Sequence, residues 1–282
     1  MNTAASASAP ATTANLGPAF DCIALALSPR CVVRARLADD WSVEHNGKHR
    51  VSPGEVDGVV AAAQRAVGDR PLTLEVENDV PLARGLGSSA AAFVAGAAAA
   101  MRAHGEDASP DRVFRIAAEM EGHADQAAAA VYGGLVLIPA EGRPQRLPIH
   151  PSLRPVVAVP DKRLPTAEAR AVLPSSYDRD VTIRSMSRVA ALTAGLTTGD
   201  PELLAAAHGD EIHESWRNAL SPEVAELIEI ARTAGAFHAA RSGAGPSVVA
   251  LVTHENAMGV ARAFEAWGAA VIDDPVETTG LV

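Results

Sequence analysis

The feature that most constrains this chain is a glycine–serine turn, residues 85–89, that leads into an alanine-rich segment ending at Met101. Gly85 and Gly87 allow the backbone to adopt a positive φ and to approach a bound group closely. A helix that begins at such a turn presents free N–H groups and the positive end of its dipole. The segment therefore predicts an anion site, usually for phosphate, rather than an ordinary capped turn before a buried helix.

Two common phosphate-binding folds do not fit this turn. The chain has two lysines, Lys48 and Lys162, and neither follows a glycine-rich turn, so the P-loop pattern is absent. The turn also lacks the third glycine of the dinucleotide-binding fingerprint, and no clean βαβ pattern surrounds it. We therefore expect a different fold to hold the phosphate.

Composition excludes several classes of protein. The 282 residues are 48% hydrophobic, which suffices for one large domain or two fused domains with a real core. A net charge of −10 and 4% aromatic residues argue against nucleic-acid binding. The N-terminal residues do not form a secretory signal, and the longest apolar run is too short to span a bilayer. Cys22 and Cys31 show no metal or disulfide pattern, so we expect a cytoplasmic protein. Together with the charge and the short apolar run, we expect that it binds neither nucleic acid nor membrane.

The first half of the chain reads as a mixture of strands and helices. We expect a loop and then a strand within residues 10–27, and a hairpin at Asn46–Gly47. The other expected elements are strands at 31–37, 41–45, 72–78 and 131–139, a helix at 54–67, and a helix that Ser109 begins.

The helix that begins at Ser109 ends in a dense group of ionisable residues: Glu119, Glu121, His123 and Asp125. This group could be a solvated helix end. It could also provide a magnesium carboxylate and a pair that orients a substrate. Because the end of the helix is not fixed by the sequence, Glu119 and Glu121 both remain candidates for the metal ligand.

The second half follows a proline-rich linker at residues 144–155. We place Thr166 and Arg170 in a loop or short helix, and Arg217 near the end of a helix. The expected elements are strands at 155–160, 248–252 and 269–273, and helices at 182–197, 201–218, 222–235 and 255–267. They fit an antiparallel sheet with helices on one side, and a second small-residue loop, residues 241–247, precedes a buried strand.

Three segments, in order and spacing, resemble the GHMP kinases: PATTANLGPAFD (10–21), GLGSSAAA (85–92) and SGAGPS (242–247). Within that superfamily the chain most resembles the homoserine kinases, through EGHADQ, PTAEAR and IHESWR. The resemblance implies an α+β GHMP kinase fold. Residues 1–150 would form a ribosomal-protein-S5-like domain, residues 151–282 a ferredoxin-like α/β sandwich, and the active site would lie in the cleft between them.

The implied activity is ATP-dependent phosphorylation of the side-chain hydroxyl of L-homoserine, which gives O-phospho-L-homoserine for threonine biosynthesis. By resemblance, Ser89 and Glu121 hold Mg²⁺. The segment that binds ATP comprises Pro81, Leu82, Ala83, Arg84, Gly85, Leu86, Gly87, Ser88, Ser89 and Ala90, with Gly243, Ala244 and Gly245 closing beside the phosphates. The acceptor residues are Asn15, Asp21, His123, Thr166, Arg170 and Arg217, and the catalytic residues are Asn15, His123 and Asp125.

The chemistry of these residue types fits a small zwitterion. Arg170 and Arg217 can bind its carboxylate through charge-assisted hydrogen bonds, and Asp21 can bind its ammonium group. No clear general base stands out, and a loose phosphoryl-transfer transition state does not require an early strong base. We therefore expect Asn15 and His123 to orient the hydroxyl.

The chain departs from the family pattern at Ala19, Gln126, Pro165 and Arg241. Gln126 is one methylene longer than the usual Asn, so it could reshape the acceptor pocket. Two alternatives therefore remain: a GHMP kinase for another small hydroxylated acceptor such as L-threonine, and a catalytically silent paralogue that binds a nucleotide or an amino acid. The resemblance also suggests a homodimer.

Overall fold

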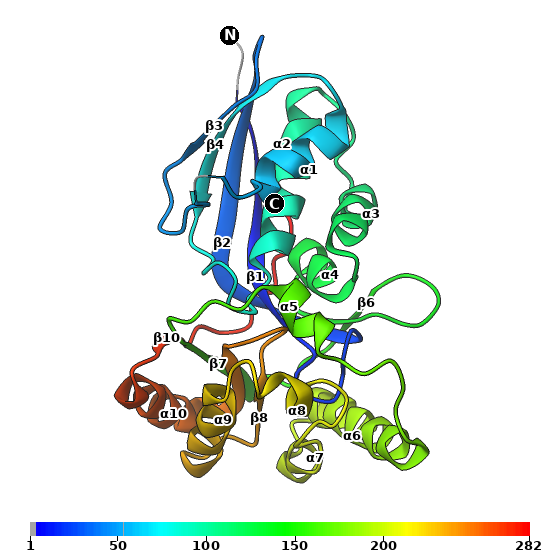
Figure 1. Cartoon of the computed structure of the whole chain (residues 1–282), viewed down its shortest axis with the longest axis vertical. Helices are drawn as coiled ribbons and strands as arrows, with labels where there is room; N and C mark the ends of the chain where they lie inside the picture. Colours follow the sequence, from blue (N-terminus) through cyan, green and yellow to red (C-terminus); the bar gives the residue numbers. More distant parts are fainter. Residues whose placement is uncertain (1–3, 53) are drawn as a thin grey trace.

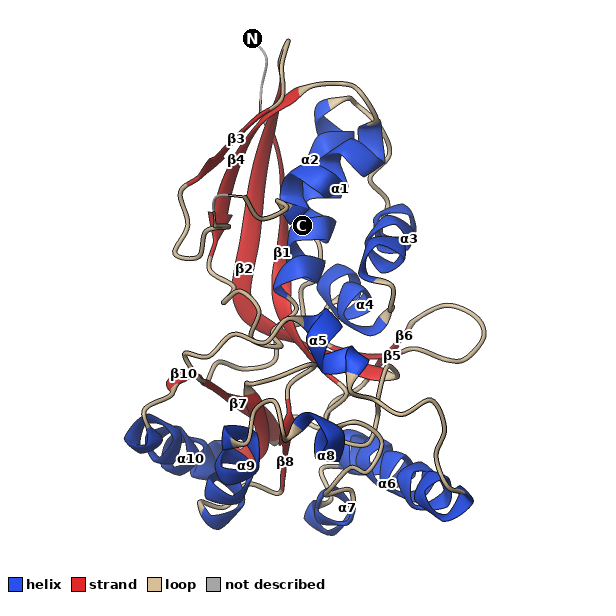
Figure 2. Ribbon diagram, viewed as in Figure 1, coloured by secondary structure: helices blue, strands red, loops and turns tan. Residues whose placement is uncertain are grey.

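The computed structural model describes residues 4–52 and 54–282, which form two sheets and the helices that cover them (Figures 1 and 2). The larger sheet has the order β3-β4-β2-β5-β6, and β1 pairs with β2 beside this path. Its strands are β1 (Ala5–Ala14), β2 (Ile23–Leu37), β3 (Ser42–His45), β4 (Leu72–Asn78), β5 (Leu135–Leu137) and β6 (Gln145–Leu147). One face is covered by α1 (Gly58–Val67), α2 (Ser88–Ala103), α3 (Pro110–Glu121) and α4 (Asp125–Tyr132).

The smaller sheet is antiparallel, in the order β10-β7-β9-β8. Its strands are β7 (Leu153–Val159), β8 (His238–Arg241), β9 (Val248–Thr253) and β10 (Ala270–Ile272). The helices of this half are α5 (Thr166–Ala171), α6 (Arg179–Thr198), α7 (Pro201–Ala206), α8 (Glu214–Arg217), α9 (Glu223–Thr233) and α10 (His254–Trp267). The expected mixture of α and β elements is confirmed.

Both faces of the smaller sheet are buried, because successive side chains of a strand point to opposite sides. Ala250 on one face belongs to a core cluster with Leu227 of α9 and Phe264 of α10. Leu251 on the other face belongs to a cluster that contains Leu192 of α6 and also residues of the larger sheet. The helices α9 and α10 cover one face, as expected, and the other face belongs to a core cluster that contains residues of both sheets.

Several expectations for the first half are corrected. Pro10 to Ala14 lie in β1 rather than in a loop. No hairpin forms at Asn46–Gly47, because β4 lies between β2 and β3, and β3 pairs with β4 in parallel. The Asn46 N–H continues this ladder by donating to Val76 O at 2.8 Å, so the chain does not reverse there. The alanines at 127–130 form α4, which shortens the strand expected at 131–139 to β5.

The second half differs from expectation mainly at one helix. The helix expected over residues 201–218 is divided into α7 and α8, with Gly209 at a φ of 85° between them. Asp210 then accepts hydrogen bonds from the N–H groups of Ile212, His213 and Glu214, which fixes a new helical turn. The linker contains β6, and the residues before the second glycine loop form β8.

The last residues of the chain return to the larger sheet, so that the C-terminus lies beside β1 and α2 (Figure 1). Ser8 and Val282 exchange two backbone hydrogen bonds, of 2.9 and 3.0 Å. Arg30 donates to the carbonyl of Gly280 at 2.6 Å. The division into residues 1–150 and 151–282 stays a prediction. None of the helices in the described ranges has the length and hydrophobicity needed to cross a bilayer.

The shared core predicts that damage in the smaller sheet destabilises the whole chain. Leu251 is fully buried, and we expect Leu251→Ala to lower the free energy of unfolding by about 2–5 kcal/mol through lost burial and a cavity. Urea unfolding followed by circular dichroism should show one shifted transition. Met258 is 60% exposed, so the control Met258→Ala should change stability by less than about 0.5 kcal/mol. Two separate transitions, with only one displaced, would contradict the shared core.

Candidate active site

The two glycine-rich loops lie in direct contact. Gly85 and Gly87 have φ values of 75° and 62°, as the sequence predicts for this turn. A Cβ at Gly85 would collide with the carbonyl oxygen of Ser242, so only glycine permits this approach. The Ser242 hydroxyl donates to Gly85 O at 2.7 Å. The turn leads into α2 at Ser88, and the N-terminus of that helix therefore opens beside the second loop.

A cleft at this junction brings together most of the residues predicted for the site. It is lined by Ala14, Asn15, Asp21, Ala83, Gly85, Leu86, Gly87, Ser88, Ser89, His123, Asp125, Gln126, Thr166, Arg170, Arg217, Gly243 and Ala244. The Gln126 amide lies against Gly243, where a Cβ would meet its Nε2 at 2.7 Å. Gln126 therefore contacts the second glycine loop as well as the cleft.

Six predicted residues do not line this cleft: Pro81, Leu82, Arg84, Ala90, Glu121 and Gly245. Ala90 is buried in the first turn of α2. The Arg84 side chain donates to the carbonyls of Pro160 and Asp161 at 2.8 and 2.7 Å, so it anchors the first loop to the segment after β7. Gly245 N donates to Ser242 O at 2.8 Å and supports the second loop.

The segment after β1 has a strained backbone. Asn15, Leu16 and Asp21 have φ values of 71°, 47° and 55°, which residues other than glycine rarely adopt. The Asn15 amide spans the site, because its Nδ2 donates to Gly243 O at 3.2 Å and its Oδ1 accepts from the Asp21 N–H at 3.0 Å. His238 Nε2 is 2.8 Å from Leu16 O, which adds a buried contact from β8.

The ionisable group after α3 divides into an exposed and a buried part. Glu119 pairs with Arg65 at 2.8 Å, and both side chains are more than half exposed. Glu121 is buried, and its Oε1 has no hydrogen-bond partner in the described chain. Burial raises the pKa of Glu121, and the Ser89 hydroxyl and the charge of His123 offset part of this rise. This geometry supports Glu121 over Glu119 as a metal ligand.

His123 lies between two carboxylates. Its Nε2 is 3.3 Å from Glu121 Oε2, and its Nδ1 is 3.0 Å from Asp125 Oδ1. Burial lowers the pKa of His123, but the hydrogen bond to Asp125 and the charges of Asp125 and Glu121 outweigh it, so the pKa is raised overall. Both ring nitrogens are therefore engaged by acceptors.

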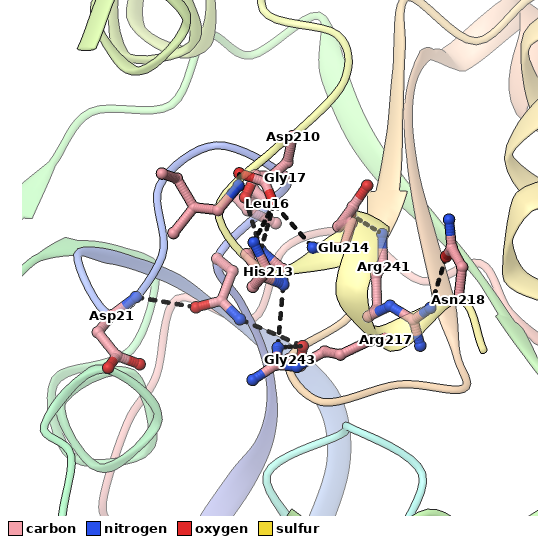
Figure 3. Close-up of polar contacts among 12 residues, drawn as sticks. Leu16, Gly17, Asp21, Asp210, His213, Glu214, Arg217, Asn218, Arg241 and Gly243 are labelled. Carbon is pink, nitrogen blue, oxygen red and sulfur yellow. Dashed lines mark hydrogen bonds and ion pairs between the residues drawn. The ribbon is translucent and has the colours of Figure 1, made fainter. Parts of the chain in front are cut away.

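The two predicted carboxylate-binding arginines both lie close to the Phe20 ring. Each guanidinium carbon is 5.3 Å from the centre of its ring. Arg170 forms a two-point ion pair with Asp21, at 3.0 and 2.6 Å. Arg217 is 1% exposed, and burial together with Arg241 and Arg170 lowers its pKa to about 10 (Figure 3).

A second, more apolar pocket adjoins the first and shares Ser88 and Ser89 with it. Its lining comprises Val51, Glu55, Val56, Gly58, Leu82, Ser88, Ser89, Ala92 and Phe93. The sequence did not predict this pocket. Its one signal in the sequence is the apolar Val56 between polar residues; the expected helix at 54–67 begins only at Gly58, which leaves Val56 86% exposed.

Comparisons with known proteins place the chain in a family. Profiles of the GHMP kinase N-terminal and C-terminal domains match residues 55–134 and 192–270. A homoserine kinase from Moorella thermoacetica is 37% identical over 259 residues, which cover 86% of this chain and 85% of the relative. The chain belongs to the GHMP kinase family. A second relative of this GHMP kinase, a homoserine kinase from Synechocystis, is 37% identical. The alignment covers 97% of this chain and 96% of the relative.

Solved structures agree with this assignment. A homoserine kinase from Cytophaga hutchinsonii superposes with a TM-score of 0.85 at 28% identity, covering 100% of this chain and 98% of that one. A mevalonate kinase shares the fold alone, with a TM-score of 0.72 at 13% identity over 97% and 99% of the two chains. The predicted GHMP kinase fold, with its S5-like and ferredoxin-like halves, is confirmed. As a GHMP kinase, the protein uses ATP with Mg²⁺.

The histidine beneath the strained segment predicts a dependence of stability on pH. Burial lowers the pKa of His238 from 6.5 to about 4, so the unfolded chain binds a proton that the folded chain excludes. The neutral His238 therefore contributes fully to the free energy of unfolding above pH 6.5, and this contribution is lost as the pH falls toward 4. Between pH 6.5 and 5, wild type should lose about 2 kcal/mol of stability relative to His238→Phe.

Urea unfolding of both proteins at several pH values measures this difference. Parallel pH profiles for wild type and His238→Phe would show that His238 is not the group responsible.

Proposed function

We propose that this chain transfers the γ-phosphoryl group of ATP to the side-chain hydroxyl of L-homoserine, giving ADP and O-phospho-L-homoserine for threonine biosynthesis. The relatives support this acceptor, since curated homoserine kinases match the chain at 36–38% identity. The observation that carries the proposal is the group formed by Asp21, Arg170 and Arg217 beside the glycine loops. One carboxylate and two guanidinium groups complement a small amino acid and place its side chain toward the phosphates.

The glycine loops and the N-terminus of α2 suit the phosphates of ATP. Ser88 and Ser89 are the first residues of the helix, where N–H groups are free and the dipole favours an anion. The neighbouring apolar pocket, with Leu82 and Phe93 in its wall, suits a flat nucleoside base. Because both pockets share the two serines, a nucleotide lying across them would present its terminal phosphate to the acceptor.

Ser89 and Glu121 fit a magnesium ion. The free Glu121 Oε1 is a buried hard oxygen beside a hydroxyl, and Mg²⁺ is commonly bound by one or two carboxylates together with substrate phosphates. Within the described residues no cluster of three or more His, Cys, Asp or Glu forms a ready-made metal centre, which agrees with a site completed by phosphate. The bound ion would neutralise charge on the phosphate oxygens.

The remaining residues are suited to orienting the acceptor. His123 has a carboxylate at each ring nitrogen, so it is poorly placed to accept a proton from the hydroxyl. The Asn15 amide is likewise held by Gly243 and Asp21. In the transfer, the hydroxyl oxygen bonds to the γ-phosphorus while the bond from the γ-phosphorus to the bridging oxygen breaks and ADP leaves. The hydroxyl proton passes late to an oxygen of the transferred phosphoryl group or to water. Such a loose transition state depends on positioning and charge rather than on a strong base.

Two other readings differ in what they predict for turnover. A related kinase would use another acceptor such as L-threonine, and Gln126 is the residue that favours it. A silent paralogue would bind its ligands without turnover. The presence of Glu121 and of both glycine loops argues against it. The homodimer and the cytoplasmic location remain predictions from the sequence.

Release of ADP tests the acceptor directly. With MgATP we expect turnover on L-homoserine and little on L-threonine, L-serine or no acceptor, because the hydroxyl must reach past the amino-acid group to the phosphates. Turnover on L-threonine alone would move the assignment to the related kinase. Binding of ATP without any turnover would support the silent paralogue.

Replacement of the two candidate carboxylates tests the metal site. We expect Glu121→Gln to lower kcat by roughly tenfold or more and to raise the Mg²⁺ concentration needed for half-maximal rate, because it removes an anionic ligand.

Glu119→Gln provides the matched control two residues away. It removes only an exposed ion pair, so the rate should stay within about twofold of wild type. ADP release measured across a MgCl₂ titration compares the two variants. A larger effect at Glu119 would reverse the assignment.

A further inference from the structure

A buried histidine contacts Arg217 in the motif IHESWR (Figure 3). His213 is four residues before Arg217, so both side chains project from the same side of the turn that contains α8. Arg217 Nη1 is 2.9 Å from His213 Nδ1. His213 Nε2 is 2.8 Å from the carbonyl oxygen of Gly17 in the strained segment. This imidazole therefore connects an arginine of the acceptor site to the loop that carries Asn15 and Asp21.

The two partners fix the protonation of the ring. A guanidinium can only donate, so Nδ1 must present its lone pair to Arg217. A carbonyl can only accept, so Nε2 must carry the hydrogen that is donated to Gly17 O. The neutral ring in this tautomer satisfies both contacts. Burial is the main cause that lowers the pKa of His213 to about 4. The negative charge of Asp210 raises this pKa and the positive charge of Arg217 lowers it, and the result agrees with a neutral imidazole.

Packing holds the ring in this orientation. His213 is fully buried and stacks on Phe20, with the ring centres 5.0 Å apart and an angle of 27° between the planes. The backbone N–H groups of His213 and Glu214 donate to Asp210 Oδ2 at 2.6 and 2.8 Å, so the start of the turn is also fixed. The imidazole therefore cannot tilt without losing its stacking on Phe20 or its hydrogen bonds.

The contacts of Arg217 leave one side of its guanidinium for a ligand. Nε donates to Ala169 O at 3.0 Å, and Nη1 donates to Gly243 O at 3.2 Å and to His213. Within the described part of the chain, no hydrogen bond uses Nη2. Arg217 lines the cleft, whereas His213 does not. We propose that His213 is a positioning residue, which orients the Arg217 guanidinium so that it can bind the carboxylate of the acceptor.

This inference rests on the proposed function, because it assumes that an amino acid is the acceptor. It does not make His213 a catalytic residue, since the ring has no exposed surface and both nitrogens are occupied. A purely structural histidine would give a different result from a positioning residue. The structural role would act on the whole site, whereas the positioning role acts only through Arg217.

The test is a double-mutant cycle on KM. His213→Phe keeps the stacking on Phe20 but removes the acceptor for Arg217. We expect the KM for L-homoserine to rise by roughly tenfold or more, because a hydrogen bond to a charged group is lost, while the KM for ATP is unchanged. His213→Asn can place its amide oxygen near the position of Nδ1 and accept from Arg217, so it should restore most of the affinity.

The second arm measures the effect of His213→Phe on the KM for L-homoserine in a protein that lacks the Arg217 side chain. We expect Arg217→Ala to raise the KM for L-homoserine strongly, and the double variant with His213→Phe to raise it no further. His238→Phe is the matched control. It removes a buried imidazole that contacts the neighbouring carbonyl of Leu16 but not Arg217, so its effect should be the same with and without Arg217.

Two results would overturn the proposal. One is an unchanged KM for L-homoserine in His213→Phe. The other is a further rise when His213→Phe is added to Arg217→Ala. If the Phe variant does not fold, His213→Leu replaces it, because it also removes the acceptor for Arg217. Lack of turnover by wild type on L-homoserine would instead refute the proposed function.

Discussion

The close contact between two glycine loops is the constraint on which the rest of the site depends. Gly85 lies so near the Ser242 carbonyl that no side chain fits between them. The first loop comes from the half of the chain with the larger sheet and the second from the half with the smaller sheet. Their contact therefore places the N-terminus of α2, the Asn15 segment and the two arginines around one cleft. A core cluster that contains residues of both sheets stabilises this arrangement.

The residues around the cleft combine strain with tight support. Three non-glycine residues between Asn15 and Asp21 have positive φ, and such a backbone persists only where its surroundings hold it in place. Here two buried imidazoles contact successive carbonyls, and the Asn15 amide connects the segment to Gly243. These contacts hold the strained segment in one arrangement, in which Asn15 and Asp21 both line the cleft.

The sequence predicted which residues line the cleft better than it predicted the details of the fold. The glycine loops and most of the acceptor residues, including Asp21 and Arg170, do line one cleft, because motif spacing reflects the fold of a known family. Their individual roles stay predictions. The Asn46–Gly47 hairpin was wrong because a local turn signal does not show that β4 inserts between β2 and β3. His213 was missed because its tautomer depends on partners far away in the sequence.

The ion pair between Asp21 and Arg170 has a consequence for selectivity. In the absence of a ligand these side chains neutralise each other inside a partly buried site. An incoming amino acid can replace both contacts at once, since it supplies an ammonium group and a carboxylate. A simple amine or a simple acid would pair with one partner only and leave the other without its counterion, a cost that solvent reduces at this partly exposed pair. The pocket thus favours molecules with two opposite charges over those with only one, before any part of the side chain is recognised.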